Sequence, residues 1–379
     1  MPINHRNLFQ LACLLSGLAA PTGAFAVDVS IPVVMPITGF MSVEGGSQRN
    51  GALLALERAP AGVKVKNEIY DTGTSATGAA AALDKALSAA PAIAAATSVF
   101  GTEMLAMLPV AKEFKVPLMT ISGLATITES SNPYIFRFLP NDREIKVAHA
   151  RYVVEKLGKK KVALVGDLTA YGQGGFKLLQ AYFIQLGAKP VMEDSVAPDS
   201  KDMSPLLRKI RDSGADVIVI HTVAQPMALI VKQARSSGID LPIVTSSSLV
   251  EPHIIKLYEP KELANVCAET PSVPEARVTP EMKAWADAYK TKFGVEPDGL
   301  ALGQYDGMMM ALSLIAGGAD TPEKLMAGFH NTTYKGIAMT YKSNGKGDMA
   351  HDAEIVCWNG TSPIPSVAIH YAGQELVLK

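Results

Sequence analysis

The sequence predicts an α/β protein whose sheets are parallel, doubly wound and covered by helices on both faces. Apolar runs of strand length alternate along the chain with segments of helical periodicity. Near-continuous apolar strands indicate a sheet that is buried on both faces, and helices are the usual crossovers between its parallel strands. The strand-length runs are residues 29–36, 63–70, 92–100, 117–122, 161–166, 216–222, 241–245 and 266–270.

Helix ends are marked by the residues that favour them. Ser204, Thr279 and Thr321 each precede a proline, and a hydroxyl cap followed by proline favours the start of a helix. Glycines stand where helices should end, because glycine readily takes the left-handed conformation of a C-terminal cap. These glycines are Gly158, Gly187, Gly214, Gly238 and Gly294.

The strand pattern begins twice, at residue 29 and again at residue 161. We therefore expect two Rossmann-like lobes of about four strands each. A turn signal at residues 343–345 predicts a hairpin between residues 337–341 and 354–358. Because ligands of open α/β sheets bind beyond the carboxyl ends of the strands, the cleft between the lobes is the expected binding site.

Residues 1–26 have the features of a secretory signal peptide. His5 and Arg6 precede a mostly apolar run over residues 8–20, and residues 24–26 form a small-x-small cleavage pattern. A run of 13 residues is too short to span a bilayer core of about 30 Å as a helix. We predict cleavage after Ala26 and an exported protein located in the periplasm.

Composition and motif content exclude several classes of protein. The chain has 35 Lys and Arg against 36 Asp and Glu, so it lacks the basic excess expected of a nucleic-acid-binding protein. No metalloprotease, nucleophile-elbow, Walker A or Cys-x-x-Cys motif occurs, and no two histidines stand at a metal-ligand spacing. We expect no catalytic residue, metal or cofactor. Cys267 and Cys357 lie in strand-like runs, and the sequence leaves open whether they form a disulfide or stay separate thiols.

Seven segments, in order, carry a resemblance to a known family. They are PITGFMSVEGGSQRNGALLALE, YDTGTSATGAAAALDKAL, ATSVFGTEMLAMLPVAKEFKVPLMTIS, NPYIFRFLPND, KKVALVGDLTAYGQGGF, VKQARSSGIDLPIV and YDGMMMAL. Across residues 29–358 the chain resembles the substrate-binding proteins of branched-chain amino-acid ABC transporters, the Leu/Ile/Val-binding type. The resemblance implies a non-enzymatic, monomeric protein that captures a small carboxylate between two lobes and delivers it to a membrane permease.

The resemblance also implies the type I periplasmic binding protein fold, in which three crossovers join two discontinuous lobes. The expected domains are the signal peptide, 1–26, lobe 1, 27–146 plus 275–353, and lobe 2, 147–274 plus 354–379.

The binding loops of the family carry over to positions that follow the predicted strands. Thr102 is an expected helix cap, and backbone amides beside it and in the loop around Ala125 would hold a ligand carboxylate. Tyr171 would reach across the cleft when it closes. The full set of expected ligand-binding residues is Phe40, Met41, Phe100, Gly101, Thr102, Ser122, Ala125, Thr126, Tyr171, His221, Gln225, Ser247, Tyr305 and Asp306.

One position departs from the family pattern and bears on the ligand. Amino-acid-binding members carry an acidic residue for the ligand's ammonium where this chain has three serines, residues 246–248. Serine cannot neutralise a buried ammonium, so either Glu251 or Asp306 supplies the charge or the ligand has no ammonium. The candidates are branched-chain or aromatic amino acids, and aromatic or 2-oxo carboxylates without nitrogen, which the missing acidic residue favours. A ligand-sensing receptor of the same fold, and a hydrolase, are the alternatives.

Overall fold

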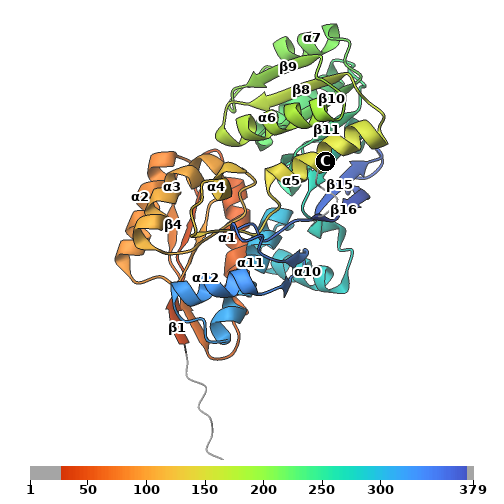
Figure 1. Cartoon of the computed structure of the whole chain (residues 1–379). Helices are drawn as coiled ribbons and strands as arrows, with labels where there is room; N and C mark the ends of the chain where they lie inside the picture. Colours follow the sequence, from red (N-terminus) through yellow and green to blue (C-terminus); the bar gives the residue numbers. More distant parts are fainter. Residues whose placement is uncertain (1–26, 374–379) are drawn as a thin grey trace, which may run out of the picture.

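The computed structural model describes residues 27–373, which form two α/β lobes, each built on its own sheet (Figure 1). The expected signal peptide, residues 1–26, lies outside the described residues, as do residues 374–379. Within the described chain, no helix is both long enough and apolar enough to cross a membrane. The predicted architecture of two doubly wound α/β lobes is confirmed.

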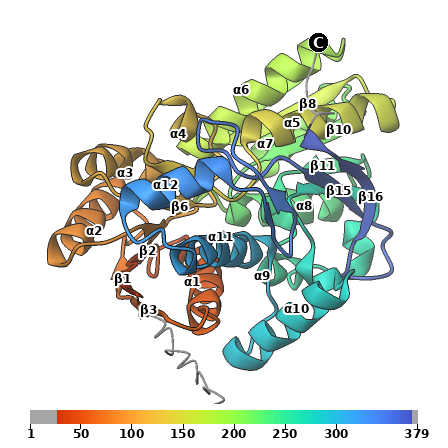
Figure 2. The ribbon, with the colours of Figure 1, turned by 60° about the horizontal axis from the view of Figure 1, so that its bottom comes forward.

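Lobe 1 is built on a sheet of five parallel strands in the order β4-β2-β5-β6-β7, with β1 and β3 forming a separate parallel pair. Helix α11 packs along α1 against this sheet (Figure 2). The elements are β1 (Val27–Ser30), β2 (Val33–Met35), α1 (Ser42–Glu57), β3 (Val63–Lys66), β4 (Ile69–Asp71), α2 (Ala76–Ala89), β5 (Ala95–Thr97), α3 (Gly101–Phe114), β6 (Leu118–Thr120), α4 (Thr126–Glu129), β7 (Ile135–Arg137), α10 (Pro280–Phe293), α11 (Gly299–Ala316), α12 (Pro322–Asn331), β13 (Tyr334–Lys335) and β14 (Thr340–Tyr341).

Lobe 2 is built on seven strands in the order β16-β15-β12-β11-β10-β8-β9, of which β15 and β16 run antiparallel to their neighbours. Its elements are α5 (Asp142–Arg151), the π-helical turn η1 (Tyr152–Lys156), β8 (Val162–Asp167), α6 (Ala170–Gln185), β9 (Met192–Val196), α7 (Ser204–Asp212), β10 (Val217–His221), α8 (Ala224–Ser236), β11 (Ile243–Thr245), η2 (Ser247–Leu249), α9 (Pro252–Ile255), η3 (Pro260–Leu263), β12 (Val266–Thr270), η4 (Pro274–Ala276), β15 (Ala353–Trp358) and β16 (Ser366–Tyr371).

The chain passes between the two lobes three times, as expected. It leaves lobe 1 after β7, returns after β12 and leaves again after β14. The residue boundaries given above for the two lobes stay predictions.

The predicted hairpin around residues 343–345 is wrong. Strand β14 pairs with β13, whereas β15 inserts between β12 and β16. The physical reason is burial, because Ile355 and Val356 of β15 are fully covered in the lobe 2 sheet. Four strands were also missed, namely β7, β9, β13 and β16. Strand β9 has the polar sequence MEDSV at the sheet edge, and β7 contains a charged residue, Arg137.

The helix-end signals hold with two exceptions, of which the first is Thr102: it lies inside α3, whose N-cap is Phe100. Thr279 and Thr321 cap α10 and α12 by accepting bonds from backbone amides, and all five expected glycines have positive φ. Ser204 instead lies inside α7, whose N-cap is Met203.

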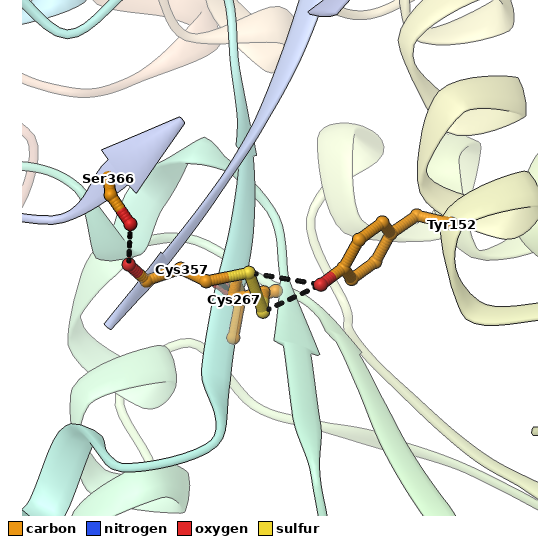
Figure 3. Close-up of a disulfide and its surroundings, with 5 residues drawn as sticks. Tyr152, Cys267, Cys357 and Ser366 are labelled. Atoms are coloured by element: carbon orange, nitrogen blue, oxygen red, sulfur yellow. Dashed lines mark hydrogen bonds between the residues drawn. A yellow bond between two sulfur atoms is a disulfide. The ribbon is translucent and has the colours of Figure 1, made fainter. Parts of the chain in front are cut away.

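Cys267 and Cys357 form a disulfide between β12 and β15 (Figure 3). The two residues are direct partners across the antiparallel strands, with their Cα atoms 4.0 Å apart. The phenol oxygen of Tyr152 lies 3.4 Å from the Cys267 sulfur and 3.1 Å from the Cys357 sulfur. The bridge therefore ties together strands that reach lobe 2 through different crossovers.

We predict that reducing this disulfide destabilises the protein. The bridge closes a loop with a sequence separation of 90 residues. In the chain-entropy model such a loop contributes about 4.6 kcal/mol to the free energy of unfolding. Thermal melts with and without dithiothreitol measure the effect, and the double variant C267S/C357S should melt at one temperature under both conditions. Equal melting of reduced and oxidised wild-type protein would show that the bridge adds no stability.

Candidate functional site

A cavity of about 50 Å³ lies between the two lobes. Its volume leaves room for roughly four water molecules, which limits an occupant to a small molecule. The lining residues follow the carboxyl ends of strands in both sheets, where ligands of open α/β sheets bind. They are Met41, Glu44, Val99, Phe100, Gly101, Ile121, Gly123, Leu139, Pro140, Asp142, Ile145, Tyr171, Val223, Ala224, Ser247, Ser248, Glu251, Glu269 and Leu300.

One wall of the cavity is apolar and joins the lobes. Met41 and Phe100 of lobe 1 are buried against Val223 of lobe 2, and Tyr171 of lobe 2 packs on the same cluster. Phe40 lies edge-on to Phe100, with ring centroids 5.5 Å apart, but about half of its surface is exposed. This wall fits an apolar group and would be exposed to water if the lobes separated.

The loop between β6 and α4 presents backbone amides without acceptors. Arg137 donates from Nη1 to the carbonyl oxygens of Ser122, Gly123 and Leu124, at 2.9 Å in each case. Every described peptide bond is trans, so the amide that follows each of these carbonyls points the opposite way. These are the amides of Gly123, Leu124 and Ala125, and within residues 27–373 they donate to no acceptor. Successive amides on one side of a loop form a site for an anion.

The lining of the cavity also carries two carboxyl groups that each have an oxygen without a hydrogen-bond partner among the described residues. Glu44 comes from α1 of lobe 1 and Glu251 from the start of α9 in lobe 2, and their side chains approach within 4.8 Å. Both are more than nine-tenths buried, and Oε2 of each has no hydrogen-bond partner among the described residues. Burial, with Asp298 nearby, raises the pKa of Glu44 to about 7. Burial and then the charge of Glu44 raise the pKa of Glu251 well above its usual value.

His253 completes a cluster that could hold a cation. Its Nδ1 lies 3.6 Å from Oε2 of Glu251, and the same three side chains are the described residues whose spacing fits a metal ion. Burial and the charge of Lys256 lower the pKa of His253, so it does not neutralise the carboxyls at neutral pH. Since Glu44 and Glu251 also line the cavity, a positively charged group of a ligand fits between them as well as a metal does.

A second buried cluster, at the edge of the cavity, contains two carboxyl groups, one lysine and one histidine, and Asp142 Oδ2 and His149 Nε2 have no hydrogen-bond partner among the described residues. Buried Lys146 forms ion pairs with Glu269 and, at 3.2 Å, with Asp142, while His149 Nδ1 lies 2.9 Å from Glu269. Burial lowers the pKa of Lys146, and both of its acidic neighbours lie close enough to form ion pairs with it. This cluster therefore does not supply the cation that Glu44 and Glu251 lack.

Tyr171 is held in place by His221. The rings lie 4.2 Å apart, and His221 Nε2 lies 3.1 Å from the carbonyl oxygen of Tyr171. Burial, followed by the charge of Lys146, keeps the pKa of His221 well below its usual value, so the imidazole is neutral. Gly175 must lack a side chain here, because a Cβ would sit 2.1 Å from the imidazole nitrogen.

The structure places the expected site residues in three groups. Met41, Phe100, Gly101, Tyr171 and Ser247 line the cavity. Behind it or beside it, on the same loops, lie Phe40, Thr102, Ser122, Ala125, Thr126, His221 and Gln225; the buried hydroxyls of Thr102 and Ser122 have no partner among the described residues.

Tyr305 and Asp306 form the third group and do not line the cavity. Tyr305 accepts a bond from Arg58. Asp306 accepts bonds from the backbone of Ile337 and Ala338, within the β13–β14 hairpin. Its carboxylate is therefore occupied by partners that do not line the cavity.

Sequence reasoning missed Glu44, Asp142 and Glu269. A signal was present for Glu269, because a charged residue in a strand buried on both faces needs a partner. Glu44 gave none, since an acidic residue in the first turn of a helix is ordinary.

The chain was compared with known proteins. The family model for periplasmic binding proteins matches residues 28–362. A Pseudomonas aeruginosa protein described as an amino acid binding protein is 27% identical over 333 residues, covering 84% of this chain and 87% of that protein. A leucine-binding protein of Thermotoga maritima superposes with a TM-score of 0.84 at 24% identity, covering 92% of this chain and 99% of that chain.

A solute-binding protein of Rhodopseudomonas palustris, solved with 3,4-dihydroxybenzoic acid, superposes with a TM-score of 0.82 at 20% identity, covering 91% of this chain and 96% of that chain. The predicted type I periplasmic binding protein fold is confirmed by these similarities, and so is the expectation that the chain is a binding protein rather than an enzyme.

We predict that a wedge at Gly174 forces the lobes apart. A Cβ at this position of α6 would lie 2.8 Å from Cδ1 of Leu124 in lobe 1, so the larger side chain of G174L must displace either the Leu124 side chain or lobe 1 itself. Leucine is also a better helix former than glycine, which protects the fold. The radius of gyration from small-angle X-ray scattering should rise in G174L at pH 5, where the raised pKa values of Glu44 and Glu251 leave both carboxyl groups protonated and no cation is needed between them. The control G46L, whose Cβ meets no atom within 4 Å, should match the wild type. An unchanged radius in G174L would contradict this contact.

Proposed function

The chain belongs to the periplasmic binding protein family, the solute-binding proteins of ABC transporters, and we propose that its ligand is an α-amino acid with an apolar side chain. The observation that carries this proposal is the pair of buried carboxyl groups, Glu44 and Glu251, that face the cavity without a cation. An ammonium group supplies that cation.

The two ends of an amino acid match the two polar sides of the cavity. The ammonium would lie between Glu44 and Glu251, and the carboxylate would bind the amides of Gly123, Leu124 and Ala125. Glu251 thus takes the role that the three serines at residues 246–248 cannot fill. Asp306 is not needed, because its carboxylate is engaged by the β13–β14 hairpin.

The remaining wall selects the side chain of the ligand. Met41, Phe100 and Val223 present apolar surface from both lobes, and burying apolar surface of a ligand there is favourable. The small volume of the cavity favours a side chain of branched-chain size over a peptide or an oligosaccharide.

Capture proceeds by a two-state closure of the lobes. The ligand docks on the amides of lobe 1, and lobe 2 then rotates to bring Glu251 and Tyr171 onto it. In the proposed cycle the protein is exported through the signal at residues 1–26, acts as a monomer in the periplasm, and presents its closed form to a membrane permease. A receptor of the same fold would report the same closure to a different partner, and loss of amino-acid uptake on gene deletion would distinguish the transporter from the receptor.

An aromatic carboxylate is the second candidate. The Rhodopseudomonas palustris neighbour was solved with such a ligand. Burial raises the pKa of Glu44 to about 7, so a protonated pair could donate hydrogen bonds to a ligand without nitrogen. A ligand without nitrogen would bind only while the Glu44–Glu251 pair keeps a proton, whereas the ammonium group of an amino acid supplies the positive charge itself.

We predict that amino acids stabilise the purified and refolded protein more than matched acids without nitrogen. A ligand at 1,000 times its dissociation constant stabilises by about 4 kcal/mol, which a thermal-shift assay detects. L-Leucine, L-valine and L-phenylalanine would be compared with 4-methylpentanoate, 4-methyl-2-oxopentanoate and 4-hydroxybenzoate. Stabilisation by the nitrogen-free acids alone would overturn the proposed ligand class.

Removing the charge of Glu251 should weaken amino-acid binding selectively. Truncating one partner of a buried charge pair costs at least about 2 kcal/mol, so the Kd of E251Q for L-leucine should rise about 30-fold or more. Binding of 4-methylpentanoate should be unchanged or tighter, because no ammonium is involved. Isothermal titration calorimetry measures both. E193Q, on the surface of lobe 2, serves as the control. Equal losses for the two ligands would mean that Glu251 does not contact an ammonium.

A further inference from the structure

We propose that Arg137, fixed by Asp348, is the positioning residue that creates the carboxylate site on the β6–α4 loop. The inference deepens the proposed function and rests on it for the identity of the ligand. Arg137 does not line the cavity, so it acts through the loop and not by contact with the ligand.

The guanidinium of Arg137 is fully buried, and each of its three nitrogens donates at least one hydrogen bond. Its Nε donates to Asp348 Oδ1 at 2.8 Å, and Nη2 donates to Thr128. Its Nη1 donates to the three loop carbonyls already described. Three consecutive carbonyls converging on one nitrogen is a conformation that the loop would not hold alone, since their partial negative charges repel. With the carbonyls fixed behind the loop, the amides of Gly123, Leu124 and Ala125 are turned the other way, and Gly123 lines the cavity.

Asp348 is held so firmly that it can fix the arginine. Asn141 and Asn344 each donate to its Oδ2 at 3.0 Å, and Thr128 donates to Oδ1 at the same distance. Although burial raises it, the charge of Arg137 and these hydrogen bonds hold the pKa of Asp348 below its usual range. The positive charge of Arg137 is thereby neutralised on the side of the loop away from the cavity.

The segment that carries Asp348 is built to reach β7 from a distant part of the sequence. Gly347 O accepts from the amide of Arg137 at 2.8 Å, and Met349 donates to the Arg137 carbonyl at 3.0 Å. Gly347 has a φ of 101°, and a Cβ there would sit 2.0 Å from the carbonyl oxygen of Ile135. Only glycine allows this approach. The segment then leads directly into the third crossover, so the loop that holds the carboxylate is anchored beside the hinge.

A second arginine provides a matched control. Arg235 of lobe 2 also donates to backbone carbonyls, those of Ile239, Leu241 and Ala264. It does not line the cavity. Lysine keeps the charge of an arginine but cannot reproduce its planar fork, so R137K and R235K remove the same kind of contact in two places. In R137K the ion pair with Asp348 can persist, which protects the fold.

The test uses acetate as a carboxylate without an ammonium. Amide resonances of ¹⁵N-labelled protein would be followed during an acetate titration in the wild type, R137K and R235K. In the wild type and R235K, the amides of Gly123, Leu124 and Ala125 should shift in a saturable way. In R137K the Kd for acetate should rise about tenfold or more, as expected when the loop amides lose their fixed orientation. N344A, which keeps the arginine and removes one bond to Asp348, should give an intermediate loss if R137K does not fold.

The results of this experiment distinguish a failure of this inference from a failure of the proposed ligand class. Loss of acetate binding in R137K but not in R235K supports the inference even if L-leucine does not bind. Absence of acetate shifts at these amides in the wild type, or equal acetate binding by R137K and the wild type, overturns it. A comparison of L-leucine with L-leucinamide provides a second measurement. The preference of the protein for the carboxylate of leucine over the amide of leucinamide should fall in R137K and persist in R235K.

Discussion

Closing the cleft places two carboxyl groups, one from each lobe, in a buried space without a cation from the protein. Within residues 27–373, no lysine or arginine forms an ion pair with Glu44 or Glu251. The pKa of Glu44, raised to about 7 by burial, exceeds its ordinary value. The protonated carboxyl group of Glu44 therefore stabilises the closed form. This stabilisation is fully present below about pH 4.5 and is lost as the pH rises through about 7. At neutral pH the closed state needs either a bound proton or a positively charged ligand.

Because of this constraint, each lobe contributes a different part of the proposed site. Lobe 1 supplies the amides of the β6–α4 loop, held by Arg137, and lobe 2 supplies Glu251 and Tyr171. Neither half of the proposed site is complete alone, because Glu44 and Glu251 form a pair only when α1 and α9 approach each other. In the proposed binding mode a zwitterionic ligand joins the two halves, and the apolar wall of Met41, Phe100 and Val223 adds burial that would be lost on opening. In the proposed binding mode, capture of the ligand and closure of the two lobes are therefore one event.

Sequence patterns predicted the parts of the structure that depend on local chemistry. Apolar runs marked the central strands, and the caps at Thr279 and Thr321 marked two helix starts. The edge strand β9 was missed because an edge strand exposes polar side chains. The turn signal at residues 343–345 did not identify the strand with which β15 pairs. The loops that follow the strands gave Met41, Phe100, Tyr171 and Ser247. Glu44 could not be found this way, because its function arises only from its distance to a residue of the other lobe.

The most direct test of the shared charge is the pH dependence of a pair of ligands that differ only in the ammonium. The ratio of the Kd of 4-methylpentanoate to that of L-leucine would be measured by calorimetry between pH 5 and pH 8. We predict that the ratio rises with pH, by up to about tenfold per unit, because the nitrogen-free acid requires a proton on the Glu44–Glu251 pair and leucine does not. A ratio that stays constant across this range would contradict the account.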